Sequence, residues 1–181
     1  MQVTETDLPG VLIIEPDVYT DNRGYFMETW SAAKYTQYGL PAQFVQDNLS
    51  LSRRGVVRGL HYQLPPQAQG KLVSVAAGAV FDVAVDIRRS SPAFGRWFGT
   101  ELSAANNKQL WIPAGFAHGF MALSDATVVL YKATDAYAPE QERCIRWDDP
   151  AIGISWPADA APVLSPKDLA GAALARAEVF E

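Results

Sequence analysis

The chain is short of the residues that build metal and disulfide sites. Its 181 residues include one cysteine and two histidines. A single cysteine forms no disulfide within the chain, which is typical of a reducing compartment, and two histidines are too few for a three-histidine zinc site. We read Cys144 as a small core residue, and we expect any chemistry to use side chains without a metal or cofactor.

Long apolar runs and runs of positive charge are also missing. No apolar stretch approaches the roughly 20 residues that cross a bilayer, and the first ten residues lack the basic and apolar regions of a signal peptide. The net charge is −5, which argues against nucleic acid or an anionic membrane as the partner. We therefore expect a cytoplasmic protein that binds neither.

Short segments of alternating hydrophobicity dominate the middle of the chain. In residues 79–87 one face carries Phe81, Val83, Val85 and Ile87, whereas the other face carries Asp82, Ala84 and Asp86. Similar β-type runs lie at 43–51, 71–77, 97–102, 118–123 and 127–133. Turn residues separate the runs, so the pattern predicts an all-β sandwich or jelly roll rather than a doubly wound α/β fold.

Helical patterns are scarce. Residues 31–39 predict one short helix, with Ser31 as its N-cap and Gly39 at its end. The alanine-rich tail from Pro166 to Ala177 suggests a second helix. The composition, 49% hydrophobic and 19% charged, is that of a packed globular protein, so we take residues 1–181 as one domain.

Both histidines lie in short glycine-containing motifs, RGLHYQ at 58–63 and IPAGFAHGF at 112–120. An imidazole suits proton transfer because its ordinary pKa is about 6.5. An ideal strand would place Arg58 and His61 on opposite faces, but Gly59 allows a bulge that turns both inward. If the chain returns as a hairpin after His61, then His61 and Lys71 project into the same barrel mouth.

The second histidine motif has the Pro-x-Gly-x-x-His pattern of cupins, in which a turn delivers the imidazole to the barrel interior. Metal-binding cupins commonly supply His-x-His and a glutamate from their first motif, whereas this chain has a single histidine there. Two histidines and a carboxylate are sufficient for some metals, but neither H-x-D nor H-x-E spacing occurs. We therefore expect no metal.

Ordered motifs along essentially the whole chain resemble the dTDP-4-dehydrorhamnose 3,5-epimerase family. They are DNRGYFMETW (21–30), FVQDN (44–48), GVVRGLHYQ (55–63), QGKLV (69–73), GAVFDVAVDIR (78–88), WIPAGFAHGF (111–120), LYKATD (130–135), ERCIRWDDP (142–150) and LSPKD (164–168). The resemblance implies a cofactor-free epimerase with a jelly-roll fold, a cupin-like double-stranded β-helix with short flanking helices. It also implies a homodimer, in which about residues 1–50 contribute to the partner.

The resemblance also implies the substrate and the catalytic residues. The substrate would be dTDP-4-dehydro-6-deoxy-D-glucose, inverted at C3 and C5 to give dTDP-4-dehydro-L-rhamnose for dTDP-L-rhamnose biosynthesis. His61 matches the base, and Asp168 matches the carboxylate that orients it. Lys71 matches the cation beside the developing enolate oxygen, and Tyr131 matches the acid on the opposite face.

The remaining matched positions would hold the substrate. Arg23 and Arg58 resemble the family's pyrophosphate ligands, and Phe26 and Tyr137 resemble the aromatic residues that hold thymine. Further binding positions are Glu28, Gln46, Asn48, His118, Glu142 and Lys167. Ala136 departs from the pattern, because many relatives carry another aromatic residue before Tyr137.

Three other functions stay open at this point. An epimerase that inverts only C3 or only C5, or a ketoisomerase, would use the same base and acid on a related dTDP-keto sugar. A non-catalytic jelly-roll module that binds sugars or nucleotides would not need a base, an acid and a cation to converge. A metal-dependent cupin oxygenase is disfavoured by the histidine count.

Overall fold

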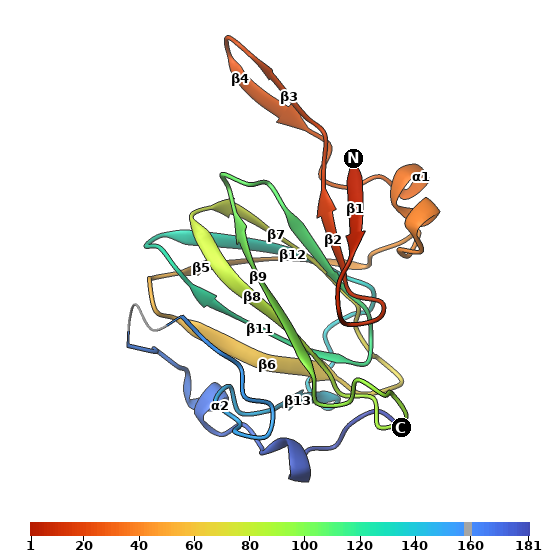
Figure 1. Cartoon of the computed structure of the whole chain (residues 1–181), viewed down its shortest axis with the longest axis vertical. Helices are drawn as coiled ribbons and strands as arrows, with labels where there is room; N and C mark the ends of the chain where they lie inside the picture. The colour runs from red at the N-terminus through yellow and green to blue at the C-terminus, as the bar shows by residue number, and fades with distance from the viewer. Residues whose placement is uncertain (158–160) are drawn as a thin grey trace.

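The computed structural model describes residues 1–157 and 161–181, and its main feature is a pair of antiparallel β-sheets (Figure 1). The larger sheet has the strand order β1-β2-β10-β7-β12-β5, and the smaller sheet has the order β13-β6-β11-β8-β9. From β5 onward the chain passes repeatedly from one sheet to the other, which is the arrangement of a jelly roll. The predicted all-β class is confirmed.

The strands are short, as the period-two pattern predicts. The larger sheet consists of β1 (Gln2–Glu5), β2 (Leu12–Glu15), β10 (Gln109–Ile112), β7 (Lys71–Ala77), β12 (Thr127–Ala133) and β5 (Gln46–Ser52). The smaller sheet consists of β13 (Glu142–Cys144), β6 (Val57–Gln63), β11 (Phe116–Ala122), β8 (Ala79–Asp86) and β9 (Trp97–Ser103). The sequence patterns do not predict β1 and β2, because strands of four residues are too short to show a period.

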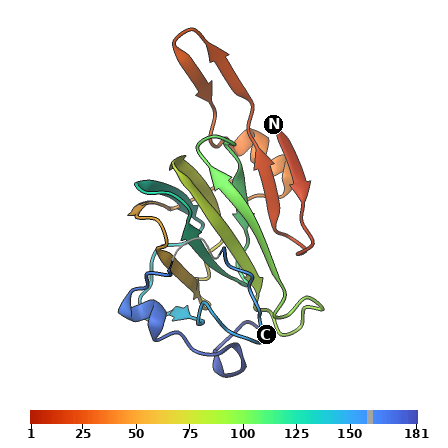
Figure 2. The ribbon, with the colours of Figure 1, turned by 60° about the vertical axis from the view of Figure 1, so that its left-hand side comes forward.

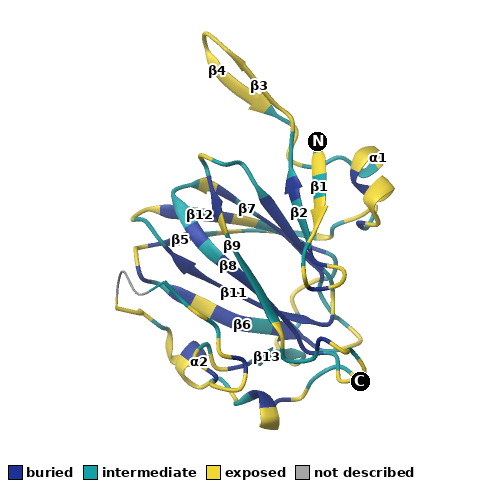
Figure 3. Ribbon diagram, viewed as in Figure 1, coloured by how far each residue is buried: buried dark blue, intermediate teal, exposed yellow. Residues whose placement is uncertain are grey.

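Apolar side chains from both sheets fill the space between them. Val73 and Val129 come from the larger sheet, and Ala84, Leu102 and Phe120 come from the smaller one; all five are buried in one cluster. Burial of apolar surface contributes about 25 cal/mol per Å², so this cluster holds the sheets face to face. Figure 3 shows that buried positions concentrate on the strands of the two sheets.

Strand β8 is buried on both of its faces. Val83 and Val85 pack in a second apolar cluster that includes residues of the C-terminal segment, whereas Ala84 on the opposite face belongs to the cluster between the sheets. Asp82 and Asp86 share the face of Ala84 and are both fully buried. The two faces of β8 therefore pack against two different apolar clusters, and the carboxylate of Asp82 lies inside the protein.

The prediction of one helix from Pro166 to Ala177 is wrong. The segment forms only α2 (Pro166–Leu169) and one turn of 3-10 helix, η2 (Leu174–Arg176). Between them the backbone pairs with the end of β13, because Ala172 N–H donates to Cys144 O at 2.9 Å. A Cβ atom on Gly171 would lie 2.7 Å from the backbone nitrogen of Arg146, so this close docking overrides the helix propensity of alanine.

The expected helix at 31–39 is present as α1 (Ala32–Tyr35) followed by the 3-10 turn η1 (Thr36–Tyr38). Gly39 ends it in the left-handed conformation, with φ of 82°. Ser31 occupies the N-cap position, but its side chain makes no capping hydrogen bond. Before this helix, the hairpin β3 (Val18–Asp21) and β4 (Gly24–Met27) projects away from both sheets (Figures 1 and 2).

The helices of the described residues are all short, and none is long and apolar enough to cross a membrane.

Candidate active site

Strand β6 carries a bulge that brings the two histidines opposite each other. His61 pairs with His118, and Arg58 pairs with Phe120. Between these two pairs, β6 contains one more residue than β11. A Cβ atom on Gly59 would lie 2.5 Å from the Cα atom of Gly119, and φ of Gly59 is +133°. Only glycine fits there, and the bulge predicted at Gly59 is confirmed.

Arg58 stays at the rim rather than turning fully inward. Its side chain crosses to the end of β5, where Nε donates to Ser52 Oγ at 3.1 Å and Nη2 donates to Leu51 O at 3.2 Å. The Arg58 residue is exposed. The guanidinium is therefore held at the end of β5, where it stays accessible to an anionic group of a ligand.

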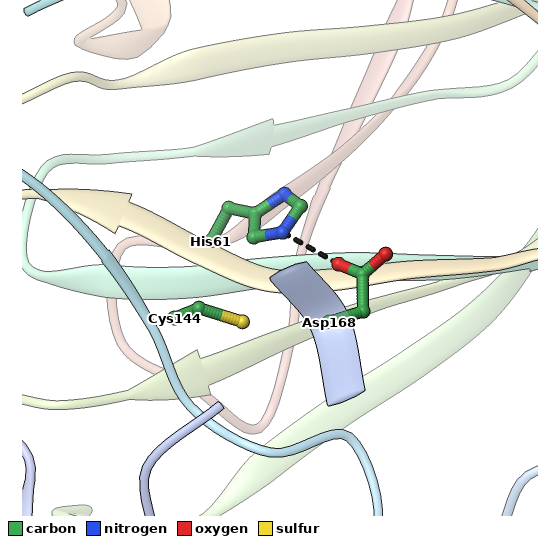
Figure 4. Close-up of side chains that lie close together, drawn as sticks. All are labelled: His61, Cys144 and Asp168. Carbon is green, nitrogen blue, oxygen red and sulfur yellow. Dashed lines mark ion pairs between the residues drawn. The ribbon is translucent and has the colours of Figure 1, made fainter. Parts of the chain in front are cut away.

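Asp168 reaches His61 from helix α2. Nε2 of His61 lies 2.7 Å from Oδ1 of Asp168 (Figure 4). The carboxylate is held in place by the backbone N–H of Gly59, which donates to Oδ1 at 3.1 Å, and by the Ser165 hydroxyl, which donates to Oδ2 at 2.6 Å. Ser165 is also the N-cap of α2 and forms a capping box with Asp168. The helix start thus positions the carboxylate.

The surroundings of this pair set its protonation state. Burial by itself raises the pKa of Asp168, but the contact with His61 and the hydrogen bonds from Ser165 and Gly59 hold this pKa well below its usual range. Burial is the largest influence on the pKa of His61, and together with the nearby Lys71 and Lys167 it lowers this pKa although Asp168 raises it. Near neutral pH the pair is therefore an ionised carboxylate beside a neutral imidazole, which is the form that accepts a proton.

Lys71 lies between the histidine and the tyrosine that the family resemblance singles out. Its Nζ donates to the backbone oxygen of His61 at 3.4 Å and lies 5.9 Å from the ring centroid of Tyr131. Only 9% of Lys71 is exposed, and burial lowers its pKa to about 8, although Glu142 and Asp82 favour the charged form. The ammonium is thus a desolvated charge inside the protein.

The expected hairpin between His61 and Lys71 is wrong, because β6 and β7 belong to different sheets. The two residues still meet, since the sheets face each other. Lys71 pairs with Ala133 of β12, and Tyr131 lies two residues before Ala133 on the same face. Burial and the nearby Glu142 raise the pKa of Tyr131, so its hydroxyl stays protonated and available as an acid.

His118 is held by Asp82, a residue that the sequence analysis did not select. His118 Nε2 lies 2.9 Å from Asp82 Oδ1, and both side chains are buried. The other carboxylate oxygen of Asp82 makes no hydrogen bond with any described residue. The negative charge of the Asp82 carboxylate favours the protonated form of Lys71. The aspartate inside the alternating pattern of β8 was the available signal, but alternation alone does not distinguish an interior carboxylate from an exposed one.

A second group of predicted residues lies at the rim, around Glu142. The Glu142 carboxylate pairs with the Lys167 ammonium of α2 and accepts the Tyr137 hydroxyl at 2.7 Å. Burial opposes the ionisation of Glu142, but Lys167 and Tyr137 lower its pKa. Tyr137 N–H in turn donates to Gln46 Oε1 at 2.8 Å, and Gln46 Nε2 donates to Asn48 Oδ1 at 2.8 Å.

Asn48 completes this arrangement because it pairs directly with Tyr131 across β5 and β12. The rim is therefore linked to the interior group of His61, Lys71 and Tyr131. Tyr137 is 52% exposed, so its ring has an open face.

The structure does not bring the predicted residues of the N-terminal hairpin to this site. Arg23 lies at the hairpin turn and pairs with Asp21, and 85% of its side chain is exposed. Phe26 is 69% exposed, and Glu28 forms an ion pair with Lys34 at 3.0 Å. Because the hairpin projects away from the sheets (Figure 1), these residues do not complete a site within one chain.

Cys144 lies beside the His61–Asp168 pair, which the sequence did not indicate. It is half-buried rather than a fully buried core residue, and it pairs with His61 across β13 and β6. Burial raises the pKa of its thiol to about 11, so the thiol is protonated near neutral pH. Cys144 is therefore not an activated nucleophile.

A neutral histidine, a buried ammonium and a protonated tyrosine lie near one another, and side chains of these kinds can accept and donate protons. Comparison with known proteins identifies the family to which the chain belongs. The model of the dTDP-4-dehydrorhamnose 3,5-epimerase family matches residues 5–176. The chain belongs to this family and is thus an enzyme of the isomerase class.

Similar proteins cover nearly the whole chain. The dTDP-4-dehydrorhamnose 3,5-epimerase of Pseudomonas aeruginosa is 55% identical over 181 residues, which is 99% of each chain. The epimerase of Legionella pneumophila, solved in complex with dTDP-4-keto-L-rhamnose, is 50% identical with a TM-score of 0.95 and covers 98% of this chain and 94% of its own. A 3'-monoepimerase of Streptomyces bikiniensis, in complex with dTDP-quinovose, is 35% identical with a TM-score of 0.89 over 94% of this chain and 86% of its own.

Proposed function

We propose that the chain inverts both C3 and C5 of dTDP-4-dehydro-6-deoxy-D-glucose and so produces dTDP-4-dehydro-L-rhamnose. The convergence of His61, Lys71 and Tyr131 from two facing sheets carries the proposal. The C4 ketone acidifies the hydrogens on both neighbouring carbons, so each inversion needs a base, a stabiliser of the enolate oxygen and an acid on the other face. The three side chains can supply these functions.

In this mechanism His61 is the base. The neutral imidazole accepts the proton from carbon, and the ionised Asp168 stabilises the imidazolium that results. Lys71 stabilises the negative charge that moves onto the C4 oxygen, and its burial makes this charge effective because little water screens it. Tyr131 then donates its hydroxyl proton to the opposite face of the carbon. No step requires a cofactor.

The rim group is proposed to hold the nucleotide. The Arg58 guanidinium suits the pyrophosphate, and the exposed ring of Tyr137 suits stacking on thymine. Gln46, Asn48, His118, Glu142 and Lys167 provide further polar contacts between this rim and the interior group.

Sequence similarity favours inversion of both centres over one. The chain is 55% and 50% identical to two named 3,5-epimerases and 35% identical to a 3'-monoepimerase. The same base and acid would serve either reaction. The test is to incubate the purified protein with dTDP-4-dehydro-6-deoxy-D-glucose in deuterated water and to follow C3 and C5 separately by NMR. Exchange and inversion at both positions support the proposal, whereas exchange at one position shows a monoepimerase and formation of a 3-keto sugar shows a ketoisomerase.

We also propose that the active form is a homodimer, in which the hairpin completes the site of the partner. The hairpin projects away from its own sheets and exposes Phe26 and Tyr19. The outer face of β5 and β12 exposes Leu49 and Leu51, and Leu130 lies directly opposite Leu49. Exposed apolar residues grouped in this way are typical of an interface.

Mixing two inactive variants tests the shared site. If Arg23 acts in the partner's site, Arg23→Ala and His61→Ala should each have low activity, and heterodimers formed on mixing should regain it because one of their two sites is intact. Turnover before and after mixing is the measurement, with sedimentation equilibrium to establish a mass of two chains. A monomer with full activity would contradict the proposal.

Lys71→Ala is expected to lower turnover by roughly 10²–10³-fold, because it removes one preorganised contact to the enolate oxygen. The fold should survive, since the change also removes a desolvated charge that has no carboxylate partner within 4 Å among the described residues. If the free energy of unfolding changes by less than about 1 kcal/mol, the melting temperature of a chain of this size should shift by only about 2–4 °C. Lys108→Ala is the matched control, because Lys108 pairs with Glu15 at 3.2 Å, outside both the proposed site and the proposed interface; equal losses in both variants would contradict the assignment.

Two further expectations belong to this proposal. We propose one jelly-roll domain for residues 1–181, which limited proteolysis would test by the absence of a stable smaller fragment.

We also propose that the enzyme acts in the cytoplasm, where nucleotide-linked sugars are made; fractionation of the source cells would test this.

A further inference from the structure

Cys144 has no part in the proposed proton transfers, yet it lies against their base. One donor atom from each of His61, Cys144 and Asp168 lies within 4.8 Å of the other two (Figure 4). In the described parts of the chain, 1–157 and 161–181, this is the one such group of three potential ligands. The group arises because Cys144 and His61 are direct partners across β13 and β6.

The donor set is that of a soft divalent cation. Zinc binds imidazole nitrogen and carboxylate oxygen at about 2.0–2.2 Å and thiolate sulfur at about 2.3 Å, so the donor atoms around one ion lie roughly 3–4 Å apart. Nε2 of His61 lies 2.7 Å from Oδ1 of Asp168, and no two of the three donor atoms are more than 4.8 Å apart. The donors therefore need to move by only about 1 Å or less to surround one ion. Magnesium and calcium prefer sites made only of oxygen donors and do not fit a cysteine and a histidine.

The donors have few partners outside the group. Nε2 of His61 is buried, and its close contact among the described residues is Oδ1 of Asp168 at 2.7 Å, which is itself a member of the group. Sγ of Cys144 has only a 3.5 Å contact with the carbonyl oxygen of Ile145. A cation with one carboxylate and one thiolate ligand would have its two charges balanced within the group.

We propose that Zn²⁺, or another thiophilic divalent cation, binds to His61, Cys144 and Asp168 and inhibits the enzyme. Binding forms a metal–sulfur bond, and the thiol proton leaves to water; no group is oxidised or reduced. Nε2 of His61 faces the ionised carboxylate and so carries the proton of the neutral imidazole. When the cation binds Nε2, this proton moves to Nδ1, and the imidazole then has no free nitrogen with which to act as a base. The inhibition, though not the binding, rests on the function proposed above for His61.

An inhibitory metal and a required metal have opposite effects on turnover. Enzyme treated with EDTA and dialysed should keep full turnover, and added Zn²⁺ should inhibit it until EDTA is added again. Mg²⁺ at the same concentration should have no effect. Loss of turnover on EDTA treatment, restored by Zn²⁺, would overturn the inference.

Cys144→Ala and Cys144→Ser supply the matched variants, and both should retain basal turnover because the thiol has no proposed catalytic role. Loss of an outer partner of a metal ligand already costs about 10–100-fold in affinity. Removal of the thiolate itself should therefore raise the Zn²⁺ concentration for half-inhibition by at least about tenfold. Equal inhibition of the wild type and both variants would show that the metal acts elsewhere.

Binding can be observed without any activity. Because Cys144 is the single cysteine of the chain, the ultraviolet charge-transfer band of a cadmium–thiolate bond reports on this residue alone. Cd²⁺ titration of the wild type should produce the band, and Cys144→Ser should not. Absence of the band in the wild type would overturn the inference, whereas a band without inhibition would support the site and count against His61 as the base.

Discussion

His61→Ala is expected to abolish measurable exchange and inversion at both C3 and C5. Removal of a positioned general base costs about 10²–10⁴-fold in rate, and the other histidine is engaged by Asp82. Asp168 does not take the place of the imidazole, because its carboxylate stays held at the start of α2 by the Ser165 hydroxyl and the Gly59 N–H. The measurement is deuterium incorporation at each carbon together with product formation, on protein whose melting curve has been compared with that of the wild type.

Cys144→Ala is the matched control for this variant, because Cys144 lies directly opposite His61 on the neighbouring strand. Cys144→Ala opens a space next to the one that His61→Ala leaves, so a general disturbance of the site would slow both variants. A selective loss in His61→Ala identifies the imidazole. Deuterium uptake at the wild-type rate in His61→Ala would remove this residue from the role of base.

The strands were predictable from local sequence, whereas the contacts that make the site were only partly so. Residues 71–77 and 127–133 are short apolar runs of the β type and form β7 and β12 with the same bounds. The bulge at Gly59 also had a local signal, since glycine is the residue that permits close backbone approach. These features depend on interactions within a few residues of one another.

The pairing of His61 with Asp168 had no such signal, because more than a hundred residues separate them. Only the family resemblance suggested it, and the structure shows why it forms: α2 is anchored by Ser165, and the tail beyond it pairs with β13. The same docking overrode the helical propensity of the alanine-rich tail. Local propensity is weak where a segment gains backbone hydrogen bonds from a sheet edge.

Asp82 and Cys144 show a second limit of sequence reasoning. The alternation of β8 indicated which residues share a face with Asp82, but not that both faces are buried. The position of Cys144 beside His61 depends on the register of β13 against β6. A shift of one residue would turn the cysteine to the other face, and no local pattern determines that register.

Tyr131→Phe is expected to separate exchange from inversion. If His61 removes a proton on one face and Tyr131 supplies one on the other, the variant still forms the enolate. His61 can then return a solvent-derived proton to the face from which the first one came. The substrate should therefore take up deuterium with retained configuration, while inversion slows by about 10²–10⁴-fold, the usual contribution of a positioned acid.

The phenylalanine keeps the ring beside the Lys71 ammonium, whose Nζ lies 5.9 Å from the ring centroid, so the packing of the site is preserved. Tyr62→Phe is the matched control, because it removes a buried hydroxyl whose partner is the backbone oxygen of Glu178, outside the proposed site. NMR can measure exchange and inversion in one sample in deuterated water. Inversion at the wild-type rate would remove Tyr131 from the mechanism, and equal loss of exchange and inversion would mean that its hydroxyl is needed to form the enolate, as a second donor to the oxygen that Lys71 stabilises.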